Sequence, residues 1–303
     1  MHQQHFRLST SMEQSEYEER FKRMEQWWEI LRSELAAIIS EKPPTIIYHY
    51  TDINGLLGMA EKGKIWATHV SRLNDTSEHL YGIKVVEDCV PKAMPTSSMP
   101  LIDKILSEFK KVDTYVTSYS TKHDLLSQWR GYSGGNVGYC LGLATNGIAT
   151  LDHSTPLLEA VIYQDHLAQK VISTMVNRVD GYLNNNQSGD VEVGSLLGMV
   201  GGTLAILACT IKHPGFEEEN EYRQFYQPGA TSLQLEKKFR NGRFGLTPYV
   251  EVPFKEEGRL PLRSVTISPC QDPELEMSIV KTLLEKYSYT NVEVHKSAIP
   301  LRV

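Results

Sequence analysis

Residues 45–68 have the sequence TIIYHYTDINGLLGMAEKGKIWAT, in which the pattern of side chains changes twice. The first six residues are β-branched or aromatic, which is typical of a strand. Residues 52–62 then carry apolar side chains at helical spacing, and Gly63 is the residue type that most often ends a helix. Residues 64–68 return to a strand pattern. A strand, a short helix, a glycine and a second strand are therefore expected.

The mixture of strands and helices continues toward the C-terminus. Further strands are expected at 114–120, 138–143, 158–163, 221–227, 249–253, 265–268 and 292–295. Helices are expected at 75–90, 101–111, 125–132, 164–183, 191–212 and 272–286, with a polar linker at 91–100. Because the two kinds of element mix without a regular strand–helix–strand rhythm, the pattern favours an α+β fold over a doubly wound sheet.

On the N-terminal side, residues 11–41 predict one long helix that ends at Pro43-Pro44. Its apolar residues alternate four and three apart and form a heptad stripe: Tyr17, Phe21, Met24, Trp28, Leu31, Leu35 and Ile38. Such a stripe either packs on the helix's own domain or forms the seam of a homodimer. The expected organisation is this helix at 1–43 and a single α+β domain at 44–303.

Composition limits the class of protein. The chain has 303 residues, of which 41% are hydrophobic and 22% are charged, as in soluble globular proteins. Its formal charge of -6 disfavours a surface built wholly to coat nucleic acid or anionic lipid. The N-terminus lacks a signal-peptide pattern, and the longest apolar stretch, 193–211, is interpreted as a buried helix. A cytoplasmic protein without a membrane partner is expected.

Several kinds of site are not supported by the sequence. Cys89, Cys140, Cys209 and Cys270 lie far apart and predict free thiols rather than disulfides or a zinc site. The chain also lacks a P-loop, a G-x-S-x-G elbow and an H-E-x-x-H motif. No metal is therefore expected.

Two polar clusters precede the middle of the chain. In Tyr48-His49-Tyr50-Thr51, the strand-end His49 could donate to a ligand hydroxyl while Thr51 caps the next helix, or both could be structural. The second cluster, Asn74-Asp75-x-x-Glu78, fits a helix capping box better than a catalytic role.

A third cluster runs from Lys212 through an acidic turn to Arg223. Glu219, Glu221 and Arg223 would share one face of an extended segment, and a carboxylate beside a guanidinium is either a structural ion pair or a site. Residues 118–120 (Ser-Tyr-Ser) and 128–132 (Gln-Trp-Arg-Gly-Tyr) offer hydroxyl groups and an aromatic plane between the clusters.

These clusters together resemble a known family. The ordered motifs are YHYT at 48–51, IWAT at 65–68, LNDxxE at 73–78, VTSYS at 116–120, DLLSQWRGY at 124–132, GYCLG at 138–142, ExEYR at 219–223 and SxIPLR at 297–302. In this order they are similar to the bacterial domain-of-unknown-function family 2971, over roughly residues 45–303. The family name implies no reaction.

A strand ending in His-x-Thr, a short helix, a glycine and a strand also resemble the start of enzymes of the ADP-ribosyltransferase superfamily. The resemblance implies a split sheet with helical insertions and NAD as a substrate. Carried over by position, it implies that His49, Tyr50 and Thr51 bind NAD and that Glu221 or Glu219 is catalytic together with His49. The remaining NAD-binding residues that it implies are Ser118, Ser120, Trp129, Tyr132 and Arg223.

The function implied is that of an NAD-dependent ADP-ribosyltransferase-like enzyme, a toxin or antiphage defence effector. It would cleave the nicotinamide glycosidic bond and modify a macromolecule, either nucleic acid or protein. A carboxylate beside the ribose would stabilise the positive charge that develops there, so the chemistry requires no metal.

Two alternatives come from other parts of the chain. A nucleic-acid-binding or nuclease-like protein could contact phosphates through the basic cluster Lys237, Lys238, Arg240 and Arg243. A non-catalytic nucleotide sensor could dimerise through residues 11–41 and bind NAD without turning it over.

Overall fold

The computed structural model describes residues 2–39, 42–73, 76–94, 99–132, 136–148, 158–186, 190–229, 234–242, 245–256 and 258–300. Asn74, Asp75 and Arg243 lie outside the described residues, as does the side chain of Glu78.

The chain forms a mixed α+β fold. The helices are α1 (His2–Ile39), α2 (Ile53–Lys62), α3 (Thr76–Ala93), α4 (Met99–Phe109), α5 (Leu126–Tyr132), α6 (Asp165–Asn185), α7 (Asp190–Thr210) and α8 (Pro273–Lys286). The strands are β1 (Ile46–Thr51), β2 (Lys64–His69), β3 (Tyr115–Ser120), β4 (Tyr139–Ala144), β5 (Leu158–Ala160), β6 (Glu221–Tyr226), β7 (Lys238–Gly242), β8 (Gly245–Pro253), β9 (Leu262–Ile267) and β10 (Glu293–Lys296).

Most of these elements were expected from the sequence, but several differ. Helix α1 begins at His2 rather than at residue 11, and β8 begins at Gly245 rather than at residue 249. Residues 91–93, expected in a linker, continue α3, which contains Pro91. Strand β5 ends at Ala160, earlier than the predicted residue 163. Residues 238–242, noted in the sequence only as a basic cluster, form strand β7, which pairs with β8.

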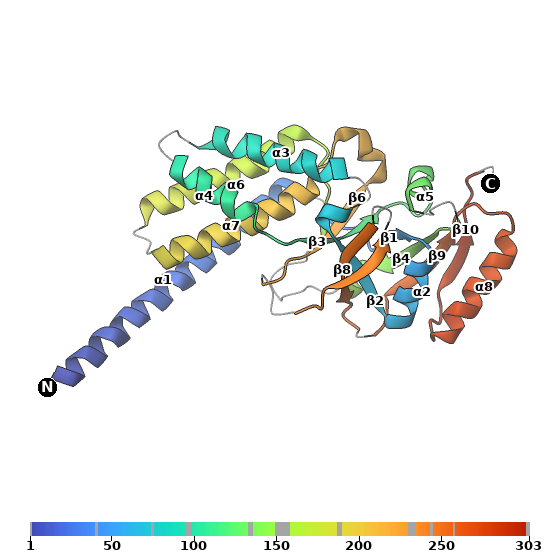
Figure 1. Cartoon of the computed structure of the whole chain (residues 1–303), viewed down its shortest axis with the longest axis horizontal. Coiled ribbons are helices and arrows are strands. Elements are labelled where there is room, and N and C mark those ends of the chain that lie inside the picture. Colours follow the sequence, from blue (N-terminus) through green and yellow to red (C-terminus); the bar gives the residue numbers. More distant parts are fainter. Residues whose placement is uncertain are drawn as a thin grey trace. The chain divides into compact units, whose positions relative to one another are not determined.

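The strands form one ten-stranded sheet in the order β10-β9-β4-β1-β3-β2-β8-β7, and β5 and β6 continue it from β3. Strands β9 and β10 are parallel, and the other pairs are antiparallel. Helix α8 packs against β9 and β10 (Figure 1).

Strand β3 is the centre of this arrangement. One edge of β3 pairs with β6 along its whole length, from Tyr115 to Ser120. The other edge pairs with two strands in turn, with β2 at Tyr115 and Val116 and with β1 only at Ser120. Strands β1 and β2 therefore diverge from opposite ends of β3. The candidate site lies where they diverge.

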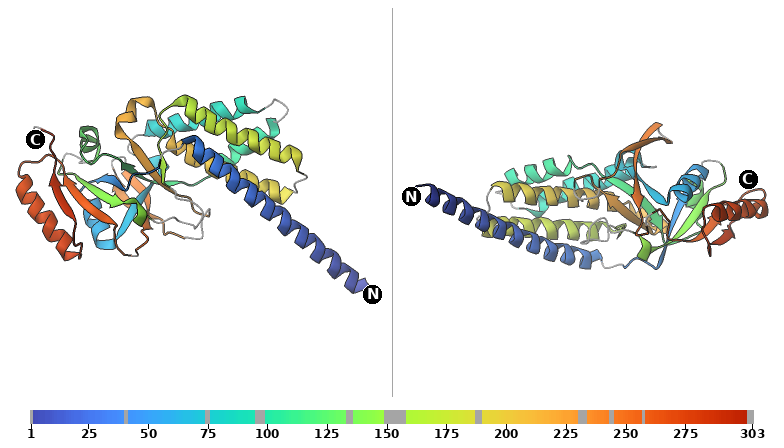
Figure 2. Two further views of the ribbon diagram at one scale, coloured as in Figure 1. Left: turned by 180° about the vertical axis from the view of Figure 1, so that it is seen from behind. Right: turned by 90° about the horizontal axis from the view of Figure 1, so that it is seen from below.

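Contacts group the chain into two compact units. The helical unit comprises Met1–Ser40, Lys84–Val112 and Asp165–Ala205, and the sheet unit comprises Glu41–Ile83, Asp113–Gln164 and Ile206–Val303. Within the helical unit α1 runs alongside α6 (Figure 2). Four residues of the heptad stripe are buried there: Met24, Trp28, Leu31 and Leu35. The chain's own helices thus cover the middle of the stripe.

Helix α2 begins and ends at residues suited to these positions. The side chain of Asp52, not that of Thr51, caps the N-terminus by accepting from the backbone N–H of Gly55 at 2.8 Å. Asp52 immediately precedes the first helical residue, and this is the position from which a side chain reaches the exposed N–H groups. Gly63 ends the helix with φ +61°, a conformation that glycine adopts without strain.

Helix α7 is long and apolar enough to cross a membrane by length and composition. The stretch Val191–Thr210 has a mean hydropathy of 1.8, and 56% of it is buried inside the chain. A core helix has the same composition, and Leu196, Val200 and Leu204 of α7 are fully buried.

Candidate functional site

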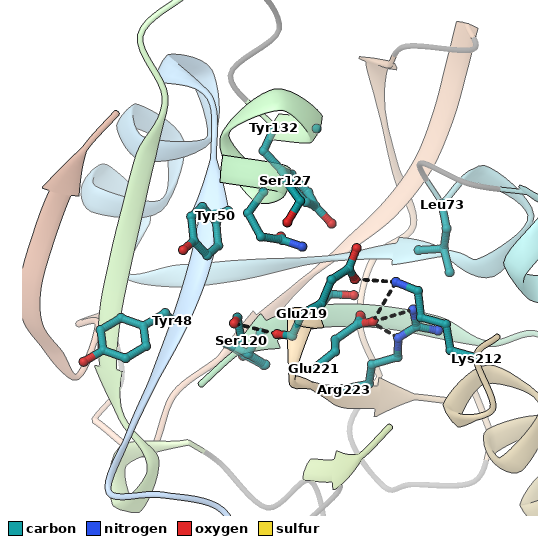
Figure 3. Close-up of a pocket in the computed structure, with 14 residues that line it drawn as sticks. Tyr48, Tyr50, Leu73, Ser120, Ser127, Tyr132, Lys212, Glu219, Glu221 and Arg223 are labelled. Atoms are coloured by element: carbon teal, nitrogen blue, oxygen red, sulfur yellow. Dashed lines mark hydrogen bonds and ion pairs between the residues drawn. The ribbon is translucent and has the colours of Figure 1, made fainter. Parts of the chain in front are cut away.

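A small cavity of about 120 Å³ lies in the sheet unit beside the end of β3. Its walls come from β1, β3, β6, helix α5, the segment that leads into β6, and Leu73. The lining residues are Tyr48, Tyr50, Leu73, Ser118, Tyr119, Ser120, Ser127, Gln128, Gly131, Tyr132, Lys212, Glu219, Glu221 and Arg223 (Figure 3).

The floor of this cavity is a buried cluster of two carboxylates and two cations. The guanidinium of Arg223 donates to both oxygens of Glu221, from Nε at 2.7 Å and from Nη2 at 2.9 Å. Lys212 Nζ donates to Glu219 at 2.5 Å and to Glu221 at 3.3 Å. All four side chains converge in Figure 3. Glu221 and Arg223 share a face of β6, as expected, but Glu219 does not: it ends a short 3-10 helix, Pro214–Glu219, that precedes the strand. Lys212 joins Glu219 to the other two residues in one ion-pair network.

Glu221 is ionised at neutral pH. Burial alone would raise its pKa, but the charges of Arg223 and Lys212, with hydrogen bonds from Arg223 and Ser118, lower the pKa to about 2. A buried carboxylate is retained only with such compensation.

Glu219 is the more accessible carboxylate. Its side chain is 16% exposed, against 7% for Glu221. Its backbone is fixed because the Ser120 hydroxyl donates to the Glu219 carbonyl at 2.7 Å. Ser120, predicted to bind NAD, thus lines the cavity and also fastens the turn that carries Glu219.

A larger cavity of about 740 Å³ adjoins the small one and shares five lining residues with it: Tyr50, Leu73, Ser118, Gly131 and Tyr132. It also contains His49, Thr51, Asp52, Trp66, Arg72, Arg130 and Arg240. Its volume is in the range of small-molecule sites. The shared walls make the two cavities adjacent, and they are together called the cleft. His49 lines the larger cavity, and the two glutamates line the smaller one.

His49 closes the gap between the diverging strands. Its Nδ1 lies 2.9 Å from the carbonyl oxygen of Ser118, in the part of β3 that pairs with neither β1 nor β2. A carbonyl only accepts, so Nδ1 carries the proton and Nε2 has a lone pair. Burial lowers the pKa of His49 to about 4, against the effect of the Ser118 hydrogen bond and together with the charge of Arg240. The neutral ring therefore presents an acceptor to a ligand, rather than the donor expected from the sequence.

Trp129 supports the cleft without lining either cavity. It is 1% exposed, and its ring meets Tyr50 edge to face at 4.8 Å. Its indole N–H donates to Asp124, whose carboxylate also accepts from Ser297 and from the backbone N–H of Ala298. Trp129, which the resemblance implied as an NAD-binding residue, therefore lies behind the aromatic residues that line both cavities, Tyr50 and Tyr132.

The predicted nucleic-acid-binding residues that the structure describes have different surroundings. Lys237 pairs with Asp113 at 3.1 Å, and Lys238 pairs with the buried Glu251 at 2.9 Å. Arg240 instead lines the larger cavity. Among the described members of this cluster, only Arg240 belongs to the cleft.

Sequence reasoning missed several residues of the cleft. Lys212 was quoted within the third cluster without a role, although a lone lysine directly after an apolar helix is a signal for a buried ion pair. Arg72, Arg130 and Trp66 gave no such signal, because nothing local distinguishes them from surface residues.

The described residues show neither a group of metal ligands nor a cysteine with a lowered pKa. Within this part of the chain, no three His, Cys, Asp or Glu side chains are grouped as metal ligands. The four cysteines are free, and burial raises the pKa of each thiol.

Comparison with known proteins gave one match. No curated protein and no solved structure matches the chain, so known proteins give no support for the resemblance to ADP-ribosyltransferases. A family model does match, over a shorter range than the expected 45–303 and across α5, β4, β5, α6, α7 and most of β6. Residues 128–224, which include Tyr132, Glu219 and Glu221 of the cleft, are similar to the family described as Protein of unknown function (DUF2971).

Proposed function

We propose that the cleft binds NAD and cleaves its nicotinamide glycosidic bond, as in an ADP-ribosyltransferase-like enzyme. The observation that carries the proposal is the adjacency of the two cavities, which share five lining residues, with His49 in one and Glu219 and Glu221 in the other. The divergence of β1 and β2 from β3 also agrees with the split sheet of that superfamily.

The proposed reaction has two steps. The bond between the ribose C1′ and the nicotinamide nitrogen breaks, and its electron pair leaves with nicotinamide. An acceptor nucleophile then bonds to C1′ and loses a proton, and the acceptor is either water or a group on a macromolecule. The ribose carries positive charge in between, and a nearby carboxylate stabilises it.

In this proposal Glu219 faces the ribose, and Glu221 holds the cluster in place. Glu219, Glu221, Lys212 and Arg223 have no net charge together, so stabilisation of a cation depends on which group lies nearest to it. Glu219 is the more exposed carboxylate, and both oxygens of Glu221 are engaged by Arg223. The neutral His49 contributes a hydrogen-bond acceptor for a ribose hydroxyl.

The test is nicotinamide release from NAD by wild type, Glu219→Gln and Glu221→Gln. We expect release by wild type and a loss of about 100-fold or more in Glu219→Gln. Glu251→Gln is the matched control, because Glu251 is also buried and pairs with two lysines but lines neither cavity. Circular dichroism and thermal melting establish that each variant is folded.

Acceptors are tested by adding labelled NAD to water alone, to nucleic acid and to a protein extract. The enzyme proposal fails if wild type neither binds nor turns over NAD with any of them. NAD binding without turnover supports the nucleotide sensor instead. Turnover that is unchanged in both cleft variants would show that the carboxylates have another role.

A further inference from the structure

The larger cavity is strongly cationic. Its described lining includes three guanidinium groups, from Arg72, Arg130 and Arg240, and a single carboxylate, from Asp52. That carboxylate caps α2 through Gly55. His49 contributes no charge at neutral pH because burial lowers its pKa to about 4. The charged groups of this lining therefore sum to +2, in a chain whose formal charge is -6.

Arg240 is the best-defined of these cations. Its Nη2 donates to the Thr68 hydroxyl at 2.9 Å, and its guanidinium lies over the rings of Trp66 and Tyr249, at 5.1 and 5.8 Å from their centroids. The two ring centroids are 5.2 Å apart, and both rings restrict the guanidinium without neutralising it. No ion pair of Arg240 occurs among the described residues.

Two donors beside this stack lack partners. In the part of the chain that the structure describes, Arg240 Nε and Trp66 Nε1 are buried and make no hydrogen bond. Such groups cost free energy unless a ligand or water satisfies them. Both residues line the larger cavity. Their unsatisfied donors and the positive charge of Arg240 favour a ligand that is an anion with several acceptor oxygens.

We propose that the larger cavity is a diphosphate subsite, in which Arg240 binds the phosphate oxygens of a dinucleotide. The inference rests on the proposed function, and it adds an orientation for the substrate. The diphosphate occupies the Arg240 side, and the nicotinamide ribose extends past Ser118 and Tyr132 to Glu219 in the small cavity. Arg72 and Arg130 add positive charge at the same subsite.

A diphosphate inside a cavity suits these contacts better than the backbone of a nucleic acid. A groove for nucleic acid presents cations along an open surface, whereas Lys237 and Lys238, the neighbours of Arg240 in sequence, are paired with acids. Arg240 alone of the described members of that basic cluster faces the cleft.

The test measures the binding of four probes to wild type and Arg240→Gln by calorimetry: ADP-ribose, inorganic pyrophosphate, nicotinamide riboside and a single-stranded RNA. We expect ADP-ribose to bind the variant about 10- to 100-fold more weakly, as for loss of a charged hydrogen bond. Nicotinamide riboside, which has no phosphate, should be unaffected. Wild-type affinity for ADP-ribose should fall with added salt more steeply than that of the variant.

Arg259→Gln is the matched control, because Arg259 also lies over a tyrosine ring, at 5.7 Å from the centroid of Tyr289, but is outside the cleft. It should bind ADP-ribose like wild type. Arg240→Lys keeps the charge without the planar fork and should bind with intermediate affinity. This second variant also covers the case in which Arg240→Gln does not fold.

The outcomes separate this proposal from the cleavage reaction. Binding of ADP-ribose or pyrophosphate that depends on Arg240, without nicotinamide release from NAD, supports the subsite and removes the enzyme. Nicotinamide release with ADP-ribose affinity unchanged in Arg240→Gln overturns the subsite alone. RNA binding that is lost in Arg240→Gln, with no binding of ADP-ribose, overturns the subsite in favour of a nucleic-acid interface.

Discussion

At the scale of single residues, two titratable groups of the cleft are held in different protonation states: one is neutral and the other is ionised. His49 is kept neutral by burial, whereas Glu221 is kept ionised by Arg223 and Lys212. A neutral imidazole and a charged carboxylate are thus available together over a wide range of pH. In the proposed function the first accepts a hydrogen bond from a ribose, and the second holds the cluster that positions Glu219.

The neutral state of His49 has a consequence for stability. Its pKa falls from 6.5 in the unfolded chain to about 4 in the folded chain, so the unfolded state takes up a proton first. Above pH 6.5 the ring is neutral in both states, and the free energy of unfolding has its full value. As the pH falls to 4, protonation of the unfolded chain lowers the free energy of unfolding by up to about 3 kcal/mol. Urea unfolding at pH 7, 5.5 and 4 should show a smaller decline in His49→Gln than in wild type. His295→Gln, at an exposed position, should decline like wild type.

The ionisation of Glu221 affects the free energy of unfolding in a lower pH range. Its pKa is about 2 in the folded chain, against 4.5 in the unfolded chain, so its contribution is complete above pH 4.5 and is lost as the pH falls through 2. At pH 7, Glu221→Gln should lower the free energy of unfolding by about 3–5 kcal/mol, because Arg223 and Lys212 stay buried with one carboxylate fewer. The difference from wild type, measured by urea unfolding, should shrink between pH 4.5 and 2. An effect of Glu236→Gln, at a largely exposed position, as large as that of Glu221→Gln would contradict this account.

At the scale of elements, strand β3 is placed by strand pairing, and helix α1 is placed by side-chain packing. Strand β3 collects β1, β2 and β6, which are far apart in sequence, and the cleft lies at that junction. Helix α1 is anchored within its unit by Trp27 on Tyr182, at 4.4 Å between ring centroids, and by an ion pair between Glu34 and Arg178. The buried middle of its stripe is the main source of that packing.

Neighbouring positions on α1 test this packing directly. Leu31 is 2% exposed and Ile30 is 67% exposed. Leu31→Ala should lower the free energy of unfolding by about 2–5 kcal/mol, because it leaves a cavity in the core. Ile30→Ala should change it by about 0.5 kcal/mol or less. Chemical denaturation of both variants measures the difference, and equal effects would mean that α1 does not pack as described.

At the scale of the whole molecule, charge and apolar surface are distributed unevenly. The formal charge of -6 coexists with a cationic cavity, so the net charge does not indicate which ligand the chain binds. The heptad stripe is likewise buried in one part and exposed in another. Met24, Trp28, Leu31 and Leu35 are buried within the chain, whereas Tyr17 is 42% exposed.

This distribution predicts the oligomeric state. A seam between two copies requires three to four heptads of free apolar surface, and the chain's own helices already cover the middle of this stripe. Sedimentation at micromolar concentration should therefore give a monomer. A dimer that Tyr17→Glu converts to a monomer would instead support the homodimer seam, the other interpretation of the stripe.

The sequence by itself determined most of the elements and their ends, because the interactions responsible act over a few residues. Alternation in residues 45–50, the cap at Asp52 and the positive φ of Gly63 are properties of the local chain. The tertiary structure decided which strands pair with β3, and that pairing gathers His49, Glu219 and Arg240 in one cleft. It also placed Arg240 in a cavity, apart from the surroundings of Lys237 and Lys238, and buried Trp129 against Tyr50. Pairing and burial of this kind depend on the packing of segments far apart in the chain, which no local pattern encodes.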